Sequence, residues 1–210
     1  MWSALGLLSY PAGILCAMDE RRTHLTGPAQ LRAVLSPVLD LLGTLRYRLV
    51  GTAAALAQGV DLPAGDVDIL LSRRSDVDTL AAALSAFPCP TPPAWLPEAR
   101  QYFARFTVAG ADLEFSTVEW PTDADVFEGA GPGPWKHHVL VALGEHLVPA
   151  VRLELRLVTE LVRDRPDRYT PLLDHLRLHG ADQHLILRAM RERGVDPVLQ
   201  RHVATQLRPS

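Results

Sequence analysis

The chain has 210 residues, of which 48% are hydrophobic, and its formal net charge is -3. This length and composition are typical of one folded unit with an attached segment, and they exclude a disordered chain. The slightly negative charge excludes the general attraction to nucleic acid that a strongly basic protein has, although a local basic groove is compatible with it. Cys16 and Cys89 lack the spacing of a zinc site or a disulfide framework, so we expect a reducing, cytoplasmic location.

Residues 1–17 are apolar but have no positive charge before the apolar stretch. Pro11 and Gly13 interrupt them too often for a segment that spans a bilayer. Two interpretations stay open: a weak signal peptide, or an overlong translation start with Met18 as the true first residue. The missing charge favours the second interpretation.

The first predicted elements are a helix, a strand and a second helix. Residues 28–45 carry apolar side chains at intervals of three and four, which predicts one amphipathic helix that stops near Gly43. A short strand is predicted at residues 47–50 and an alanine-rich helix at residues 52–58. The turn residues of 61–65 then predict a loop.

The middle of the chain has the pattern of a sheet. Residues 66–71 alternate polar and apolar side chains and then become wholly apolar, which predicts a strand that enters a buried sheet. Residues 76–87 predict a helix, and the proline-rich residues 88–97 predict an irregular surface connection. Two strands joined by a hairpin turn are predicted at residues 102–108 and 112–118.

The last part of the chain changes to helical patterns. Residues 128–134 predict a Gly/Pro-rich loop, and residues 137–143 predict one more strand. Four helices are predicted beyond Val148, at residues 152–163, 171–178, 182–193 and 197–207. We therefore divide the chain into a catalytic domain of residues 18–148 and a C-terminal helical segment of residues 149–210.

The residues with the clearest chemistry begin where the first predicted strand ends. Gly51 lets the backbone approach a polyphosphate, and Thr52 at the next helix start adds a hydroxyl and N–H donors. Asp66 and Asp68 lie two apart on a strand, so both carboxylates face one side. Such a pair repels unless a cation neutralises it, and magnesium prefers oxygen ligands. These residues therefore predict a site for magnesium and a nucleotide.

Residues 49–52 (Leu-Val-Gly-Thr) and 66–69 (Asp-Val-Asp-Ile) resemble the signature of the nucleotidyltransferase superfamily related to DNA polymerase beta, with Thr52 where serine is usual. The resemblance covers residues 32–118. It implies an α+β fold, with a small mixed β-sheet flanked by helices and a C-terminal helical segment. It also implies transfer of a nucleotidyl group from a nucleoside triphosphate, with ATP as the expected nucleotide, to an acceptor hydroxyl. Mg2+ or Mn2+ would be the cofactor and pyrophosphate the second product.

The predicted helical segment is similar to the substrate-side helices of small bacterial members of this superfamily, including antibiotic-modifying and toxin-antitoxin types. The acceptor implied is therefore a small molecule, an RNA or a protein, and a toxin-antitoxin type would also have a protein partner. The alternative is a catalytically degenerate protein of the same fold that binds a nucleotide or a protein partner without turnover.

The resemblance also implies a third carboxylate on a neighbouring strand. Asp112 and Glu114 share one face of the predicted strand, and both are candidates. We favour Glu114 because it lies inside the strand, whereas Asp112 lies next to the turn. Glu114 would then hold the metal with Asp66 and Asp68 and be the candidate general base. The competing interpretations are an outward-facing residue for Glu114 and a solvated strand entrance for the two aspartates.

Further residues have a functional and a plainer interpretation. Lys136, the only lysine, follows a Gly/Pro loop and could contact a triphosphate, but a lone loop lysine is more often solvated. Arg163, Arg165 and Arg168 could contact a phosphate, but the interspersed aspartates favour local ion pairs. Trp120, like two other tryptophans in or beside predicted loops, could stack on a base or pack its loop.

Overall fold

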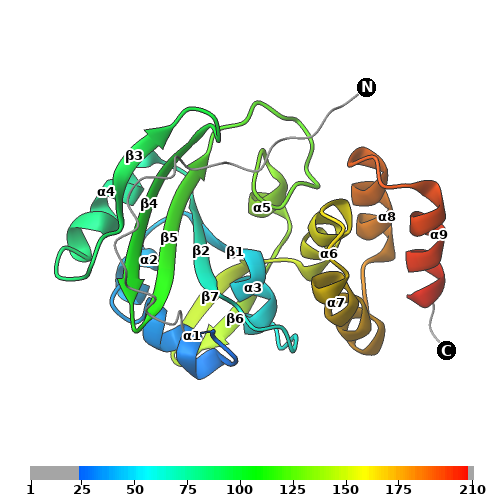
Figure 1. Cartoon of the computed structure of the whole chain (residues 1–210), viewed down its shortest axis with the longest axis horizontal. Helices are drawn as coiled ribbons and strands as arrows, with labels where there is room; N and C mark the ends of the chain where they lie inside the picture. Colours follow the sequence, from blue (N-terminus) through cyan, green and yellow to red (C-terminus); the bar gives the residue numbers. More distant parts are fainter. Residues whose placement is uncertain (1–23, 208–210) are drawn as a thin grey trace, which may run out of the picture.

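The structure is a computed structural model that describes residues 24–207, so our interpretation of residues 1–17 lies outside the described part. Within this part seven strands form one sheet: β1 (Tyr47–Val50), β2 (Asp66–Leu71), β3 (Thr91–Leu96), β4 (Gln101–Val108), β5 (Ala111–Val118), β6 (His138–Leu143) and β7 (His146–Val151). Their order is β3-β4-β5-β2-β1-β7-β6 (Figure 1). The sheet is mixed, because β2 is antiparallel to β1 but parallel to β5.

Nine helices occur in the same residues: α1 (Pro28–Leu35), α2 (Leu39–Leu42), α3 (Gly51–Ala57), α4 (Arg74–Ala83), α5 (Gly133–Lys136), α6 (Leu153–Val162), α7 (Pro166–His179), α8 (Gln183–Glu192) and α9 (Pro197–Gln206). The last four form a group at one end of the sheet (Figure 1). The chain has the predicted α+β fold, with a mixed sheet, flanking helices and a C-terminal helical segment. No helix in residues 24–207 is long and apolar enough to cross a membrane.

The single helix predicted over residues 28–45 is wrong, because the structure contains the two shorter helices α1 and α2 there. The break follows Ser36, whose N–H still donates to the Arg32 carbonyl. The next residue, Pro37, has no N–H for a continued helical ladder, and its ring would clash with a carbonyl of the preceding turn. The apolar period continues across the break because both helices pack on the same core.

Two strands of the structure were not predicted from the sequence. β3 lies within the proline-rich residues 88–97, where the sequence predicts an irregular connection. It is an edge strand that pairs only with β4, and its register shifts between Thr91 and Ala94, where a ladder tolerates the missing N–H groups of proline. β7 contains Pro149 and was not predicted. It crosses the domain boundary drawn at residue 148, and that boundary stays a prediction.

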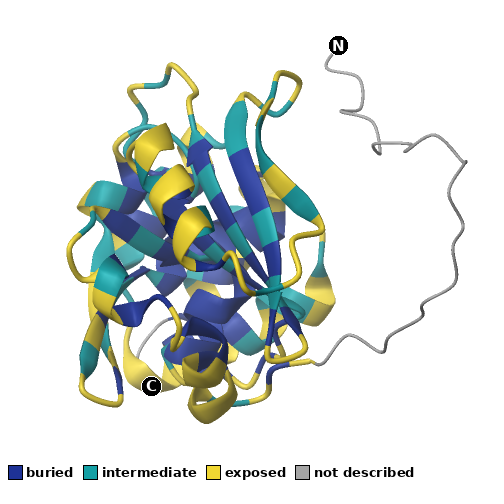
Figure 2. Ribbon diagram, turned by 90° about the vertical axis from the view of Figure 1, so that its left-hand side faces the viewer, coloured by how far each residue is buried: buried dark blue, intermediate teal, exposed yellow. Residues whose placement is uncertain are grey.

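The sheet separates a buried face from the face that carries the acidic residues. The inward side chains of β2 and β5 are 0% exposed: Val67, Ile69, Leu113 and Phe115. Figure 2 shows the alternation as dark blue and teal bands along the strands. The parallel register places Asp66 beside Asp112 and Asp68 beside Glu114. All four carboxylates therefore lie on one face, as the period of two predicts.

Helix α6 joins the helical group to the sheet domain. It packs against α3 on one side and against α7 and α8 on the other. Almost all of it is buried, including the charged side chains of Arg156 and Glu160, which are 5% and 0% exposed. Buried charges persist in proteins when they are paired. The partners of these two residues lie in the pocket described next.

Candidate active site

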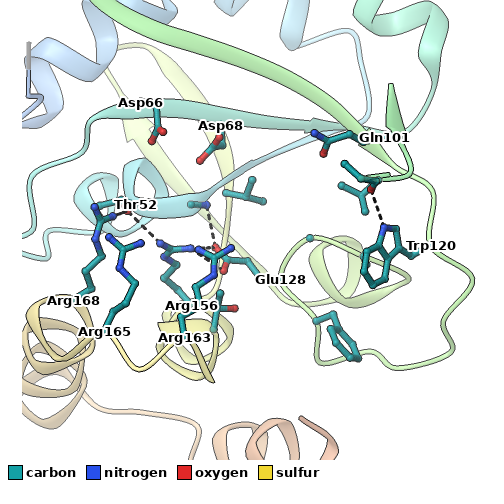
Figure 3. A pocket seen from close by; sticks show the side chains of 18 of the residues that line it. Thr52, Asp66, Asp68, Gln101, Trp120, Glu128, Arg156, Arg163, Arg165 and Arg168 are labelled. Atoms are coloured by element: carbon teal, nitrogen blue, oxygen red, sulfur yellow. Dashed lines mark hydrogen bonds and ion pairs between the residues drawn. The ribbon is translucent and has the colours of Figure 1, made fainter. Parts of the chain in front are cut away.

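A pocket of about 560 Å³ lies where the starts of α3 and β2 face the loop after β5 and the helices α6 and α7 (Figure 3). Its volume is in the range of small-molecule binding sites. The sheet side contributes Gly51, Thr52, Asp66 and Asp68 to the lining. Five arginines come from the helical side: Arg156, Arg163, Arg165, Arg168 and Arg193. The pocket therefore has an acidic wall and a basic wall.

Gly51 and Asp68 fit together so closely that only glycine suits this position. Val50 pairs with Asp68 across the β1–β2 ladder, which brings Gly51 beside the aspartate. Gly51 has a φ of 68°, a conformation that residues with a side chain rarely adopt. A Cβ at Gly51 would lie 2.1 Å from Oδ2 of Asp68. The predicted glycine bend is therefore present, and it makes room for the Asp68 carboxylate.

Asp66 and Asp68 both line the pocket, and Figure 3 shows their carboxylates side by side above the arginines. Burial raises the pKa of Asp68 well above its ordinary value, and the negative charges of Asp66 and Glu114 raise it further. The Arg156 guanidinium acts in the opposite direction but does not compensate fully. The charged form of Asp68 is thus disfavoured first by burial and then by its acidic neighbours.

Glu114 lies beside Asp68, but its carboxylate is bound by another residue. Arg105 of β4 pairs with Glu114 in the ladder, and its Nη2 lies 2.7 Å from Oε1 of Glu114. Burial raises the pKa of Glu114, and Arg105 counteracts this. Arg105 Nε also lies 3.9 Å from Asp112. In residues 24–207, no three His, Cys, Asp or Glu side chains are placed as a ready metal site.

Thr52 is held by two arginines from the helical side. Its side chain is buried, and its Oγ1 accepts hydrogen bonds from Arg156 Nη2 at 3.2 Å and Arg168 Nη1 at 2.6 Å (Figure 3). A hydroxyl has two acceptor sites and one proton. Because both acceptor sites are used, the Thr52 proton is left for donation, and Thr52 can serve as a hydrogen-bond donor to an anion in the pocket.

The arginines after α6 form ion pairs, but mainly with a buried glutamate and not with the interspersed aspartates. Glu160 contacts Arg156 directly and lies 3.7 Å from both Arg163 and Arg165. Arg168 is 3.8 Å from the exposed Asp167. Their guanidinium groups nevertheless line the pocket. The sequence favoured local ion pairs over phosphate binding for Arg163, Arg165 and Arg168. In the structure these arginines form ion pairs and also line the pocket.

Glu128 is a site residue that the sequence did not reveal. Its side chain is buried, and Oε1 accepts the backbone N–H of Gly51 at 3.0 Å. Its Oε2 accepts from Arg156 Nη1 at 3.1 Å. Glu128 lies in a Gly/Pro-rich loop without period, and Arg156 lies inside a regular helix pattern, so neither has a local sequence signal.

Lys136 is not brought to this pocket. It is the last residue of α5, and its ammonium group lies 2.6 Å from Asp125 Oδ2. Its side chain is 63% exposed, and it is absent from the described pocket lining. The structure therefore brings together Gly51, Thr52, Asp66 and Asp68, with Glu114 adjacent and Lys136 apart.

Comparisons with known proteins bear on the fold. No protein-family model and no curated protein sequence matches the chain. Among solved structures, the chain is similar to a candidate nucleotidyltransferase from Thermotoga maritima, with a TM-score of 0.52 and 18% identity over 76% of this chain and 99% of that chain. It is also similar to an antigenic nucleotidyltransferase-like protein from Paracoccidioides brasiliensis, with a TM-score of 0.47 and 13% identity over 88% of this chain and 94% of that chain. At 18% identity, the first similarity establishes the fold and leaves the reaction open.

Proposed function

From the nucleotidyltransferase fold of the chain, we propose that it transfers a nucleotidyl group from a nucleoside triphosphate, expected to be ATP, to the hydroxyl of an acceptor. The acceptor oxygen attacks the α-phosphorus, the bond from this phosphorus to the bridging oxygen breaks, and pyrophosphate leaves. One observation carries the proposal. Asp66 and Asp68 face the same pocket as Gly51 and Thr52, opposite a wall of arginines.

The basic wall suits the triphosphate. Arg163, Arg165 and Arg168 present guanidinium groups to the pocket, and guanidinium is the side chain best matched to phosphate oxygens. The Thr52 hydroxyl, whose oxygen already accepts from two arginines, adds a neutral donor. These residues would hold the β- and γ-phosphates and stabilise the charge of the leaving pyrophosphate.

The acidic wall suits a divalent cation. Asp66 and Asp68 offer the oxygen ligands that Mg2+ prefers. Burial first, and the charges of Asp66 and Glu114 second, raise the pKa of Asp68, and a cation bound there would favour its charged form. Bound there, Mg2+ or Mn2+ would neutralise the acid pair and the triphosphate together. Glu114 fits as a third ligand only once its carboxylate is released from Arg105.

Glu114 is also the proposed general base. It lies next to Asp68 on the same face, and burial raises its pKa, which makes its carboxylate a better proton acceptor. It would accept the acceptor's hydroxyl proton as the new phosphate ester bond forms. This role again requires release of Glu114 from Arg105.

A second candidate is a protein of this fold that binds a nucleotide without turnover. Two observations favour it: Arg105 holds Glu114, and Glu128 uses the Gly51 N–H that a phosphate would otherwise accept from. Magnesium-dependent binding of ATP in calorimetry, with no product from any acceptor, is the expected result for this candidate.

The proposal is tested by pyrophosphate release from ATP with magnesium and a cell extract, followed by mass spectrometry of the labelled product. Asp66→Asn and Asp68→Asn keep the side-chain shape and remove the charge, and both are expected to abolish release. Asp123→Asn, an exposed aspartate outside the pocket, is the matched control and should release pyrophosphate at the normal rate. Equal release by the wild type and both pocket variants would contradict the proposal.

A further inference from the structure

We infer that the end of the pocket around Trp120 binds the acceptor, and that this acceptor is an uncharged molecule with an aromatic or similarly planar group. The inference rests on the proposed function and names the substrate class of the same site. We define the Trp120 end by four residues of the pocket lining: Ala99, Gln101, Val118 and Trp120.

The two ends of the pocket differ in charge. Figure 3 shows Thr52 and Arg168 on one side of the acid pair, and Gln101 and Trp120 on the other. We place the leaving pyrophosphate at the end with Thr52 and Arg168, because the arginines there carry the positive charge that it requires. In phosphoryl and nucleotidyl transfer, the attacking and leaving oxygens lie roughly in line on opposite sides of the phosphorus. The attacking hydroxyl therefore enters from the Trp120 end.

The sheet connects the Trp120 end to the proposed base. Gln101 of β4 pairs with Val118 of β5, and Val118 lies four residues beyond Glu114 on the same strand. Side chains at even spacing on a strand share a face, so Glu114 and Val118 point to the same side. Four residues of strand span about 13 Å, so an acceptor bound over Val118 has to extend along this face to bring its hydroxyl to the carboxylate that takes its proton.

The Trp120 end has no charged lining residue. Three charged residues adjoin these four in sequence, and none of them lines the pocket: Glu98, Arg100 and Glu119. Both carboxylate oxygens of Glu119 accept from Arg74 at 2.8 Å. Arg193 is half-buried, and its guanidinium lies 4.8 Å from the centroid of the Phe127 ring, in the loop after β5. An acceptor with phosphates, such as an RNA end, would find no solvated cation among these four residues.

Trp120 presents a fixed aromatic surface. Its indole Nε1 donates to the Ala99 carbonyl at 3.0 Å, which satisfies its one polar group and fixes the plane of the ring. The residue is nevertheless 48% exposed, so a large part of the ring is available to a ligand. Stacking on such a ring suits a planar group, and the Gln101 amide can donate to or accept from a neutral polar group.

The test uses ligand pairs that differ only in one phosphate: uridine with uridine monophosphate, and phenyl glucoside with its 6-phosphate. A short single-stranded RNA is the polyanionic probe. Binding to the full chain is measured by ligand-observed NMR, with magnesium and a non-hydrolysable ATP analogue present. We expect each neutral compound to bind at least about tenfold more tightly than its phosphorylated partner, because the four residues that line the Trp120 end include an aromatic ring and no cation.

Two tryptophan variants link the result to Trp120. Trp120→Ala should weaken the neutral compounds by about tenfold or more, and Trp120→Phe should retain most of the affinity. Trp95→Ala removes another exposed indole, outside the pocket, and should change nothing. The affinity for the ATP analogue should be the same in all three variants and the wild type.

Several results would overturn the inference. They are stronger binding of a phosphorylated probe or the RNA, no binding of any neutral compound, or equal effects of Trp120→Ala and Trp95→Ala. A loss of ATP-analogue binding in Trp120→Ala, with unchanged binding of inorganic tripolyphosphate, would assign Trp120 to the nucleobase instead. Failure of the wild type to bind the ATP analogue with magnesium would contradict the proposed function itself, which separates the two failures.

Discussion

The carboxylate of Glu128 accepts the backbone N–H of Gly51 at 3.0 Å, at the glycine bend beside Asp68. The same carboxylate binds Arg156, which also donates to Thr52. The buried carboxylate of Glu128 thus accepts from a backbone N–H and a guanidinium group, the two kinds of donor that would also bind a phosphate oxygen. A nucleotide phosphate that approaches Gly51 must compete with this internal anion.

Glu128→Gln is therefore expected to raise the affinity for ATP and for inorganic tripolyphosphate by about three- to tenfold. The amide oxygen can still accept from Gly51, but the negative charge is gone. The positive charge of Arg156 is then less compensated inside the protein and attracts the ligand more strongly. Calorimetry with each ligand measures the effect. The same substitution should lower the free energy of unfolding by about 1–3 kcal/mol, because it breaks a buried charge pair. Weaker binding of tripolyphosphate would show that Glu128 supports the phosphate site.

Gly51→Ala should abolish magnesium-dependent nucleotide binding. The new Cβ would meet Oδ2 of Asp68 at 2.1 Å and displace this carboxylate. The φ of 68° adds a backbone cost of about 1–2 kcal/mol. Gly59→Ala is the matched control, since Gly59 also has a positive φ of 87° but its nearest neighbour, His175, would be 3.7 Å away. Both variants should lose stability, and only Gly51→Ala should lose binding; similar binding by the two would show that the contact with Asp68 is unimportant.

The acidic face of the site was predictable because its pattern is local. A period of two places Asp66 and Asp68 on one side of β2, and Asp112 and Glu114 on one side of β5. That both pairs share one face of the sheet depends on the register between β2 and β5, which the structure supplies. The Gly51 bend is equally local. Choosing between Asp112 and Glu114 was harder, because both lie near Arg105, which belongs to another strand.

The basic wall could not be predicted in the same way. Glu128 contacts Gly51 across 77 residues of sequence, and Arg156 contacts Thr52 across 104. Such contacts depend on how α6 and the loop after β5 pack on the sheet domain. Similarly, the prolines of β3 are acceptable only because β3 lies at the edge, and the order of strands is not a local property.

Asp68→Asn should stabilise the protein at neutral pH when no divalent cation is present. The folded state raises the pKa of Asp68, mainly through burial, so the stability that this group contributes is full below its unfolded pKa. That stability is lost as pH rises through the folded pKa, and asparagine avoids the loss because it carries no charge. Each unit of pKa shift corresponds to about 1.4 kcal/mol.

The difference in melting temperature between Asp68→Asn and the wild type is measured from acidic to alkaline pH. It should grow with pH, reach several degrees, and shrink when magnesium is added, because only the wild type keeps both carboxylates. Asp123→Asn, at an exposed position, should follow the wild type at every pH. A variant less stable than the wild type at neutral pH would show that the Asp68 charge is well compensated in the fold.

Arg105→Gln should raise the affinity of the protein for Mg2+ by about threefold or more. Arg105 Nη2 lies 2.7 Å from Glu114, so its removal takes a cation away from the acidic wall and releases the carboxylate. If Glu114 is the third ligand, Glu114→Gln should weaken magnesium binding, and Arg105→Gln should have little further effect in that background. Arg74→Gln is the control, because it removes an arginine of similar pairing, with Glu119, outside the pocket. Magnesium is titrated calorimetrically into five proteins: the wild type, the two single variants, the double variant and the Arg74→Gln control. Equal affinities for the wild type and Arg105→Gln would mean that Arg105 does not limit access of the cation to Glu114.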